Sequence, residues 1–171
     1  LAAVAYSNFV VVVVDNGSTD ESVAELSERF PDVPLLQTGS NLGFPGGCNV
    51  GIEWSLERGA DYVLLLNPDT IVEPGLLTSM LEAAEGGAAA VVGAVVRSPS
   101  GHLLFAQREY PQSLFYGKRL GLPSGESLVW SSDEADACAM MLGRQFLLDR
   151  LAQRGHYLDP SLFLYCEEIE L

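Results

Sequence analysis

Basic residues are scarce in this sequence. Nine lysines and arginines stand against 23 aspartates and glutamates in 171 residues, which gives a formal net charge of -14. Phosphate backbones and anionic membranes attract clusters of Lys and Arg, so this balance predicts that the protein has no nucleic-acid partner. An acidic surplus suits a protein that recruits a divalent cation, although acidic side chains also serve solubility.

Cysteines and long hydrophobic runs are also in short supply. Cys48, Cys138 and Cys166 are far apart and form no C-x-x-C pair, which argues against a zinc cage or a disulfide framework and favours reduced thiols in a cytosol. No apolar run approaches the roughly 18 residues that cross a bilayer, and the first residues lack the basic region of a signal peptide. We therefore expect a cytoplasmic protein with no transmembrane segment in this chain. Any position at the inner face of the membrane would depend on other segments or partners.

The motifs of two common nucleotide-binding classes are missing as well. Residues 39–47 are rich in glycine, but no Gly-Lys-Ser/Thr follows them, and the turn after the first apolar run lacks G-x-G-x-x-G. Neither an ATPase nor a dehydrogenase is therefore supported. Two alternatives stay open for Gly43, Gly46 and Gly47. They cradle a phosphate at the N-terminus of the following helix, or they form a tight loop that packs this helix against a sheet.

What the sequence does contain is two apolar runs that end abruptly in polar residues. Four valines at positions 11–14 lead directly into Asp15, and the run 62–66 leads directly into Asn67 and Asp69. In open α/β sheets, ligands gather just beyond the carboxyl ends of the strands. We therefore expect both aspartates to lie at one rim of a sheet.

Apolar spacing and turn residues predict alternating strands and helices over most of the chain. The expected strands are 9–14, 35–38, 62–66, 88–96 and 135–142; the expected helices are 22–30, a helix from the glycine-rich loop to about 58, 74–87 and 144–154. A long loop is expected over 111–132. This order predicts an α/β fold with a three-layer, mainly parallel sheet and helices on both faces, in one domain over residues 1–171.

Four motifs occur in order along the chain. They are Asp15-Asn16-Gly17-Ser18-Thr19-Asp20, Asn41-Leu42-Gly43-Phe44-Pro45-Gly46-Gly47-Cys48-Asn49-Val50-Gly51, Leu66-Asn67-Pro68-Asp69-Thr70 and Tyr165-Cys166-Glu167-Glu168-Ile169-Glu170. Together they resemble the inverting glycosyltransferases of the GT-A fold, glycosyltransferase family 2, and most closely its rhamnosyltransferase-like members. The resemblance covers nearly the whole chain. It also implies a preceding strand and a final helix, so we expect the family's first strand and C-terminal end to be missing here.

For the donor, the resemblance implies a nucleotide-diphosphate sugar, with UDP or dTDP as the expected nucleotide. Asp15 would accept a hydrogen bond from the base, since a carboxylate suits an imide N–H. The other residues expected to shape the nucleotide pocket are Gly17, Ser18, Asn41, Gly43, Asn49 and Asn67. A plainer alternative for Asp15 is an Asx-type turn made with Asn16.

For the metal, Asn67-Pro68-Asp69 occupies the place of the family's Asp-x-Asp motif. The resemblance implies that this motif holds Mn²⁺ or Mg²⁺ against the diphosphate, and hard oxygen ligands suit both ions. Asn67 departs from the pattern because its amide brings no charge, so Asp69 is the expected metal ligand. The alternative for Asp69 is a helix cap ahead of Pro74.

For the chemical step, Glu167, Glu168 and Glu170 match the family's Glu-Asp-x-Asp segment. The resemblance implies that Glu168 is the general base that takes the proton of the acceptor hydroxyl, with Glu167 as an alternative base. A glutamate stands where the family has an aspartate, and its extra methylene shifts the carboxylate by about 1.5 Å. The alternative is an exposed acidic loop.

These expectations combine into an inverting, metal-assisted glycosyl transfer to an acceptor hydroxyl. The acceptor would be a carbohydrate or a lipid-linked precursor of a polysaccharide or glycolipid. Arg144 could steady an anionic group or simply pack at the surface. The main rival is a non-catalytic nucleotide-sugar-binding or scaffold domain of the same fold. A nucleotidyltransferase ranks last because the loop after Val14 lacks Arg and Lys.

Overall fold

The computed structural model of this chain describes residues 3–105, 107–109, 118–120, 129, 132, 135 and 137–163. By their contacts the residues divide into two compact units. The first unit comprises Leu1–Ser7 and Leu64–Gly143, and the second comprises Asn8–Val63 and Arg144–Leu171. The single domain expected over the whole chain stays a prediction.

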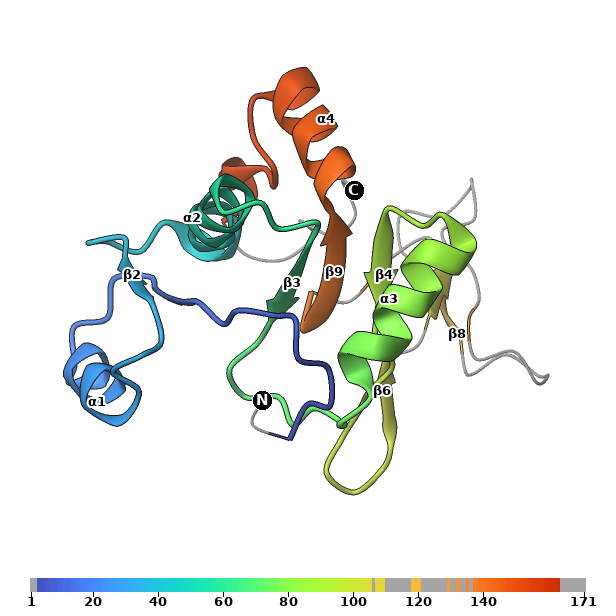
Figure 1. Cartoon of the computed structure of the whole chain (residues 1–171), viewed down its shortest axis with the longest axis horizontal. Coiled ribbons are helices and arrows are strands. Elements are labelled where there is room, and N and C mark those ends of the chain that lie inside the picture. The colour runs from blue at the N-terminus through green and yellow to red at the C-terminus, as the bar shows by residue number, and fades with distance from the viewer. Residues whose placement is uncertain are drawn as a thin grey trace. The chain divides into compact units, whose positions relative to one another are not determined.

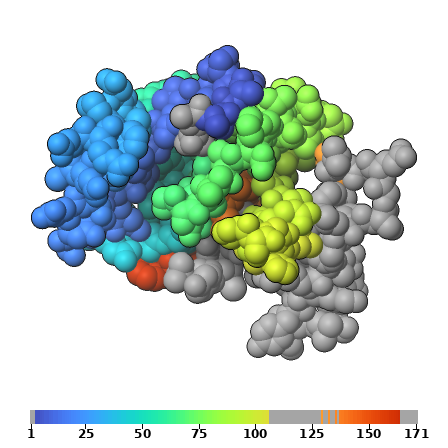
Figure 2. Space-filling model, turned by 90° about the horizontal axis from the view of Figure 1, so that it is seen from below, coloured from blue at the N-terminus to red at the C-terminus, as the bar shows by residue number. Residues whose placement is uncertain are grey.

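The second unit contains the first β-α-β arrangement of the chain (Figure 1). Its elements are β1 (Val13–Asp15), α1 (Ser22–Arg29), β2 (Leu35–Gln37), α2 (Gly43–Glu57), α4 (Arg144–Arg154) and the 3-10 helix η1 (Pro160–Leu162). Strands β1 and β2 pair in parallel, with Asp15 opposite Gln37. Ile52, Leu147 and Leu158 are completely buried and form part of this unit's core. Helix α1 buries none of its residues, and Figure 2 shows its segment, in light blue, at the surface.

The first unit is built around β9 (Ala139–Gly143). This strand lies between β3 (Tyr62–Leu66), of which residues 64–66 belong to this unit, and β4 (Val91–Gly93) in a three-stranded sheet, and it pairs antiparallel with β4. Its first four residues are all buried. Helix α3 (Leu76–Gly87) contributes Leu77, Met80 and Ala84 to the core at helical spacing. The remaining strands form two antiparallel pairs, β5 (Val96–Arg97) with β6 (Leu103–Phe105) and β7 (Gln107–Glu109) with β8 (Lys118–Leu120).

The alternation of strands and helices expected from the sequence is confirmed through β4, but the single mainly parallel sheet is not. Among the described residues the strands form four small sheets, and β1–β2 is parallel whereas β4–β9, β5–β6 and β7–β8 are antiparallel. The expected strand 88–96 is divided, because the chain leaves β4 after Gly93 and re-enters a hairpin at Val96. The expected loop 111–132 contains β8, and most of its other residues lie outside the described part. None of the helices described is long and apolar enough to cross a membrane.

Candidate functional site

Asp15 is the last residue of β1, and only 8% of its surface is exposed. Its Oδ1 accepts a hydrogen bond of 3.2 Å from the backbone N–H of Ser18, which is a local contact from side chain to backbone within the turn that follows β1. Its carbonyl oxygen accepts bonds from the backbone N–H and the hydroxyl of Thr38, at 3.0 and 3.2 Å. Because burying a carboxylate is costly without compensating partners, this position suits an incoming hydrogen-bond donor.

Asn16 joins two loops that are far apart in the sequence. Its Oδ1 accepts bonds from the N–H of Leu42 at 3.0 Å and the hydroxyl of Thr38 at 3.3 Å. Its Nδ2 donates to the carbonyl of Gly43 at 2.8 Å and to Oδ1 of Asn41 at 3.4 Å. One amide thus fastens residues 15–18, called the β1 loop from here on, to the start of α2.

The N–H groups in the first turn of α2 donate hydrogen bonds to other parts of the protein. The N–H groups of Leu42, Gly43 and Phe44 donate to Oδ1 of Asn16, Oδ1 of Asn41 and the carbonyl of Phe163, at 3.0, 2.9 and 2.7 Å. Pro45 follows and has no N–H to offer. These are the four positions that lack partners inside a helix, so the phosphate-cradle alternative loses its donors here. The structure favours the other alternative, in which the glycines serve packing.

The expected glycine-rich loop 39–47 is therefore corrected, because its second half is already helical. Helix α2 begins at Gly43. A Cβ at Gly47 would lie 3.1 Å from Cγ of Asn16, and a Cβ at Gly51 would lie 3.1 Å from Cγ2 of Val14. The two positions are one helical turn apart, so small residues allow this face of α2 to approach the end of β1 closely.

Two glycines with positive φ have no room for any side chain. Gly17 has a φ of +83°, and a Cβ there would lie 2.5 Å from the carbonyl carbon of Ser40 and 2.6 Å from the nitrogen of Asn41. Gly43 has a φ of +75°, and its Cβ would lie 2.5 Å from the carbonyl oxygen of Phe163. The β1 loop, the start of α2 and residue 163 are therefore in direct backbone contact.

Asn49 lies further along α2 and is engaged elsewhere. Its Nδ2 donates to the carbonyl of Leu158 at 2.8 Å, and its Oδ1 accepts from the N–H of Leu158 at 2.9 Å. The structure thus brings the predicted residues Asp15, Gly17, Ser18, Asn41 and Gly43 together around the β1 loop, whereas Asn49 anchors the segment after α4. A role for Asn49 in the nucleotide pocket stays a prediction.

Arg144, the first residue of α4, caps the C-terminal end of α2. Its Nη1 donates to the carbonyl of Leu56 at 2.9 Å and to that of Ala60 at 3.2 Å. Leu56 lies in the last turn of α2, where positive charge is favoured, and Ala60 follows three residues after the helix ends at Glu57. Of the two roles named for Arg144, the structural one has the support of this geometry.

We expect Arg144→Ala to lower the free energy of unfolding by about 1–3 kcal/mol, because hydrogen bonds from a charged donor are lost and the carbonyls stay partly buried. Urea unfolding followed by circular dichroism measures the change. Arg29→Ala is the matched control, since its pair with Glu25 is 3.5 Å long and both side chains are about two-thirds exposed. Equal effects of the two substitutions would contradict the capping role.

In the first unit, residues 67–70 form a tight turn directly after β3. The carbonyl of Asn67 accepts bonds from the N–H and the hydroxyl of Thr70, at 3.2 and 2.7 Å. The side-chain Nδ2 of Asn67 donates to Sγ of Cys138 at 3.4 Å, and its N–H donates to the carbonyl of Cys138 at 3.0 Å. Asp69, at the tip of the turn, is exposed. We call residues 67–70 the β3 turn.

The sequence model for Glycosyl transferase family 2 matches residues 1–151, which is most of the chain. The chain belongs to this family. The resemblance inferred from the four motifs is confirmed, and membership implies the nucleotide-diphospho-sugar transferase type of fold, GT-A.

Curated relatives agree with the family assignment. The chain is 29% identical over 180 residues to N-acetylglucosaminyl-diphospho-decaprenol L-rhamnosyltransferase of Mycobacterium tuberculosis, an alignment that covers 94% of the chain and 59% of the relative. It is 28% identical over 163 residues to low-salt glycan biosynthesis hexosyltransferase Agl10 of Haloferax volcanii, covering 93% of the chain and 50% of that relative. The chain therefore spans between half and three fifths of the length of these relatives.

The donor set of the β3 turn fits a metal ion that arrives with a ligand. No group of three His, Cys, Asp or Glu side chains that could hold a metal occurs among the described residues. Mg²⁺ commonly binds through one or two carboxylates together with substrate phosphates, and the exposed Asp69 meets that requirement. Cys138 holds the nitrogen side of the Asn67 amide, so the oxygen is turned away from the thiol. Asp69 is one exposed carboxylate in this turn, and the metal assignment itself stays a prediction.

The acidic segment with Glu167 and Glu168 lies outside the described residues, so the position of the expected base is untested. Asp15 and Asp69 belong to different compact units. Their expected convergence at one rim therefore stays a prediction as well.

Four residues that contact the predicted residues were not given these roles from the sequence. Asn16 was weighed only as a turn residue, and Thr38, Cys138 and Phe163 were given no role. The sequence held a signal for Asn16, because an amide side chain directly after a strand-terminal aspartate can both donate and accept hydrogen bonds. The other three contacts depend on tertiary pairing, which no local pattern reveals.

Proposed function

We propose that this chain carries the donor-binding and catalytic part of an inverting glycosyltransferase. The enzyme would move a sugar from a UDP- or dTDP-sugar to an acceptor hydroxyl with the help of Mn²⁺ or Mg²⁺. The observation that carries this proposal is the buried Asp15 at the end of β1, fixed in a polar loop against α2, in a chain that belongs to glycosyl transferase family 2. The complete three-layer GT-A sheet is part of the same proposal.

On the donor side, Asp15 would accept a hydrogen bond from the imide of the uracil or thymine base. The β1 loop is suited to this task because Asn16 fixes it through four hydrogen bonds. Gly17 and Ser18 are small, so their backbone would lie close to the ligand. A loop held this firmly loses little freedom on binding, which favours affinity.

On the diphosphate side, Asp69 would hold the divalent cation, with the amide oxygen of Asn67 as a neutral neighbour. When bound, the cation supplies positive charge that offsets the charge on the departing diphosphate. One carboxylate and one amide make a weak metal site on their own, so we expect the cation and the nucleotide to bind together.

In the transfer step, the acceptor oxygen would attack the anomeric carbon from the face opposite the nucleotide. The bond from that carbon to the diphosphate oxygen breaks, and the nucleoside diphosphate leaves with the bonding electrons. Glu168 would take the acceptor's proton as the new bond forms, because a neutral alcohol is a poor nucleophile. Glu167 remains the alternative base.

The acceptor class follows from the relatives. One is named for transfer of L-rhamnose to N-acetylglucosaminyl-diphospho-decaprenol and another for glycan biosynthesis. We propose a carbohydrate or lipid-linked acceptor in polysaccharide or glycolipid synthesis. Work on such an acceptor suits a cytoplasmic position at the inner face of a membrane.

The second candidate is a non-catalytic nucleotide-sugar-binding or scaffold domain. It is favoured by two departures from the family pattern, Asn67 in place of an aspartate and Glu168 in place of an aspartate. This candidate and the enzyme share ligand binding but differ in turnover, so a turnover assay separates them.

Asp69→Ala should remove the metal-dependent part of nucleotide binding. A ligand at 100 times its Kd stabilises the folded state by about 2.7 kcal/mol, which corresponds to a rise in Tm of roughly 5–10 °C for a chain of this size. We expect UDP or dTDP with Mn²⁺ to give such a rise in wild type, and Asp69→Ala to retain only the smaller shift seen with nucleotide alone. The Tm of both proteins, measured by thermal shift with nucleotide in the presence and absence of Mn²⁺, gives this difference.

Glu73→Ala is the matched control, because Glu73 is an exposed carboxylate in the same unit, shortly after the β3 turn. This variant should respond to Mn²⁺ as wild type does. A full Mn²⁺-dependent shift in Asp69→Ala would remove Asp69 from the proposed site.

A further inference from the structure

Thr38 is the first residue after β2, and its backbone continues the pairing of β1 with β2. Its N–H donates to the carbonyl of Asp15 at 3.0 Å, directly beyond the pair formed by Asp15 and Gln37. The side chain is half-buried. Threonine is branched at Cβ, which restricts its first side-chain torsion, so a backbone fixed in this way also fixes the position of the hydroxyl.

The hydroxyl of Thr38 lies among three oxygen atoms from different parts of the site. They are the carbonyl of Ser40 at 2.7 Å, the carbonyl of Asp15 at 3.2 Å and Oδ1 of Asn16 at 3.3 Å. A hydroxyl has one hydrogen to donate, so the shortest bond, to Ser40, is the principal one. The other two oxygens already accept from backbone N–H groups, those of Thr38 itself and of Leu42.

Residues 38–41, called the β2 turn from here on, lie against the β1 loop. A Cβ at Gly17 would lie 2.5 Å from the carbonyl carbon of Ser40 and 2.6 Å from the nitrogen of Asn41, so the two backbones touch. Thr38 holds both sides of this contact, because its N–H bonds to the end of β1 and its hydroxyl bonds to Ser40. The conformation of the β1 loop therefore depends on the β2 turn.

We propose that Thr38 is a positioning residue for the nucleotide base. Its hydroxyl keeps Ser40 against Gly17, and this contact keeps the β1 loop in the conformation in which Asp15 meets the base. A loop that is fixed before the ligand arrives loses little freedom on binding. The inference rests on the proposed function, and it assigns Thr38 to the base-binding part of that site alone.

The exposure of the β2 turn separates this role from a merely structural one. Ser40 and Asn41 are exposed, so water can replace the donor to the Ser40 carbonyl when the hydroxyl is removed. The stability of the fold then changes little, whereas the turn gains freedom that nucleotide binding has to remove again. A merely structural hydroxyl would lower the stability and leave the affinity of the folded protein unchanged.

Thr38→Val removes the hydroxyl and keeps the branched shape of the side chain. We expect the Kd of UDP, and of dTDP in a parallel series, to rise about 5–20-fold in isothermal titration calorimetry, because the loop is ordered only on binding. The factor should be the same with and without Mn²⁺, since Asp69 is untouched. The Tm without ligand should fall by less than about 4 °C, as expected for one hydrogen bond at a solvated turn.

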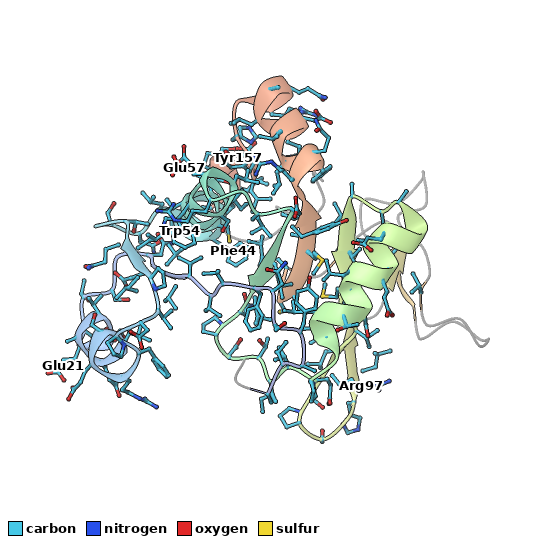
Figure 3. All side chains as sticks on the ribbon, viewed as in Figure 1. Glu21, Phe44, Trp54, Glu57, Arg97 and Tyr157 are labelled. Carbon is cyan, nitrogen blue, oxygen red and sulfur yellow. The ribbon has the colours of Figure 1, made fainter. Side chains whose placement is uncertain are left out.

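Two further variants serve as controls. Thr38→Ser keeps the hydroxyl and should keep the Kd within about threefold of wild type. Ser55→Ala removes another half-buried hydroxyl of the second unit, which donates to the carbonyl of Gly51 at 2.7 Å. Its neighbour Trp54 and Glu57 belong to the last turn of α2 (Figure 3), whereas the β1 loop contacts the first turn. Ser55→Ala should therefore bind nucleotide as wild type does.

The positioning role is wrong if wild type binds UDP or dTDP and Thr38→Val binds it equally well. It is also wrong if Thr38→Ser or Ser55→Ala loses as much affinity as Thr38→Val, or if binding by Thr38→Val falls only with the folded fraction. If wild type binds neither nucleotide, the proposed function fails and this inference fails with it.

Discussion

Gly17→Ala is expected to lower the free energy of unfolding by about 2–5 kcal/mol and to abolish nucleotide binding at ordinary ligand concentrations. The substitution has two costs. A side chain at a φ of +83° costs about 1–2 kcal/mol, and a Cβ only 2.5 Å from the carbonyl carbon of Ser40 forces backbone apart at a further cost of about 1–3 kcal/mol. The displaced backbone belongs to the β1 loop and to Ser40 and Asn41, which contact it, so Asp15 moves with the loop.

Gly39→Ala separates the two costs. Gly39 has a φ of +74° in the same unit, but a Cβ there would meet nothing within 4 Å. This variant should lose only the conformational part, about 1–2 kcal/mol, and should bind nucleotide as wild type does. Urea unfolding gives the stabilities and thermal shift gives the binding. Equal losses of stability in both variants would contradict the close contact between the β1 loop and Ser40.

Glu168→Gln is expected to reduce kcat by about 10²–10⁴-fold, the usual contribution of a general base. Glutamine keeps the size and hydrogen bonding of the side chain but cannot take the acceptor's proton. Donor binding should be unchanged, because the roles proposed for Asp15 and Asp69 do not involve this carboxylate. The measurement is release of nucleoside diphosphate at saturating donor, with the donor KM determined in parallel.

Glu167→Gln decides between the two carboxylates. If Glu168 is the base, Glu167→Gln should lose less than about tenfold in kcat, and Glu28→Gln, an exposed carboxylate on α1, should lose nothing. A larger loss for Glu167→Gln than for Glu168→Gln would transfer the role to Glu167. Equal and small losses in both would remove the acidic motif from the chemical step.

Local sequence patterns predicted the bounds of several strands and helices. Strand β3 and helix α4 lie at the expected residues, and α1 ends one residue early. The valine run at 11–14 was expected to form a longer strand, but β1 starts only at Val13 and includes Asp15. Backbone pairing with β2 decides where β1 begins and ends, and apolar composition alone does not contain that information.

Tertiary contacts explain what the sequence could not predict. Gly43 was expected to lie in the glycine-rich loop 39–47, yet α2 begins there, and hydrogen bonds with Asn16, Asn41 and Phe163 hold its first residues. Strand β4 pairs antiparallel with β9 and β5 pairs antiparallel with β6, so the mainly parallel sheet expected from the alternation is not confirmed. Asp15 and Asp69 could be singled out from the sequence because each stands where an apolar run gives way to polar residues, and their roles stay predictions.

The central claim is that this chain transfers a sugar, and the most direct test is turnover of nucleotide sugars by wild type. The chain is incubated with UDP- and dTDP-sugars and a carbohydrate or lipid-linked acceptor, with and without Mn²⁺, and both the released nucleoside diphosphate and the anomeric configuration of the product are measured. We expect Mn²⁺-dependent release with inversion at the anomeric carbon. If turnover stays at background under conditions where thermal shift shows that the donor is bound, the proposed enzymatic function is contradicted. The non-catalytic binding domain is then the remaining candidate.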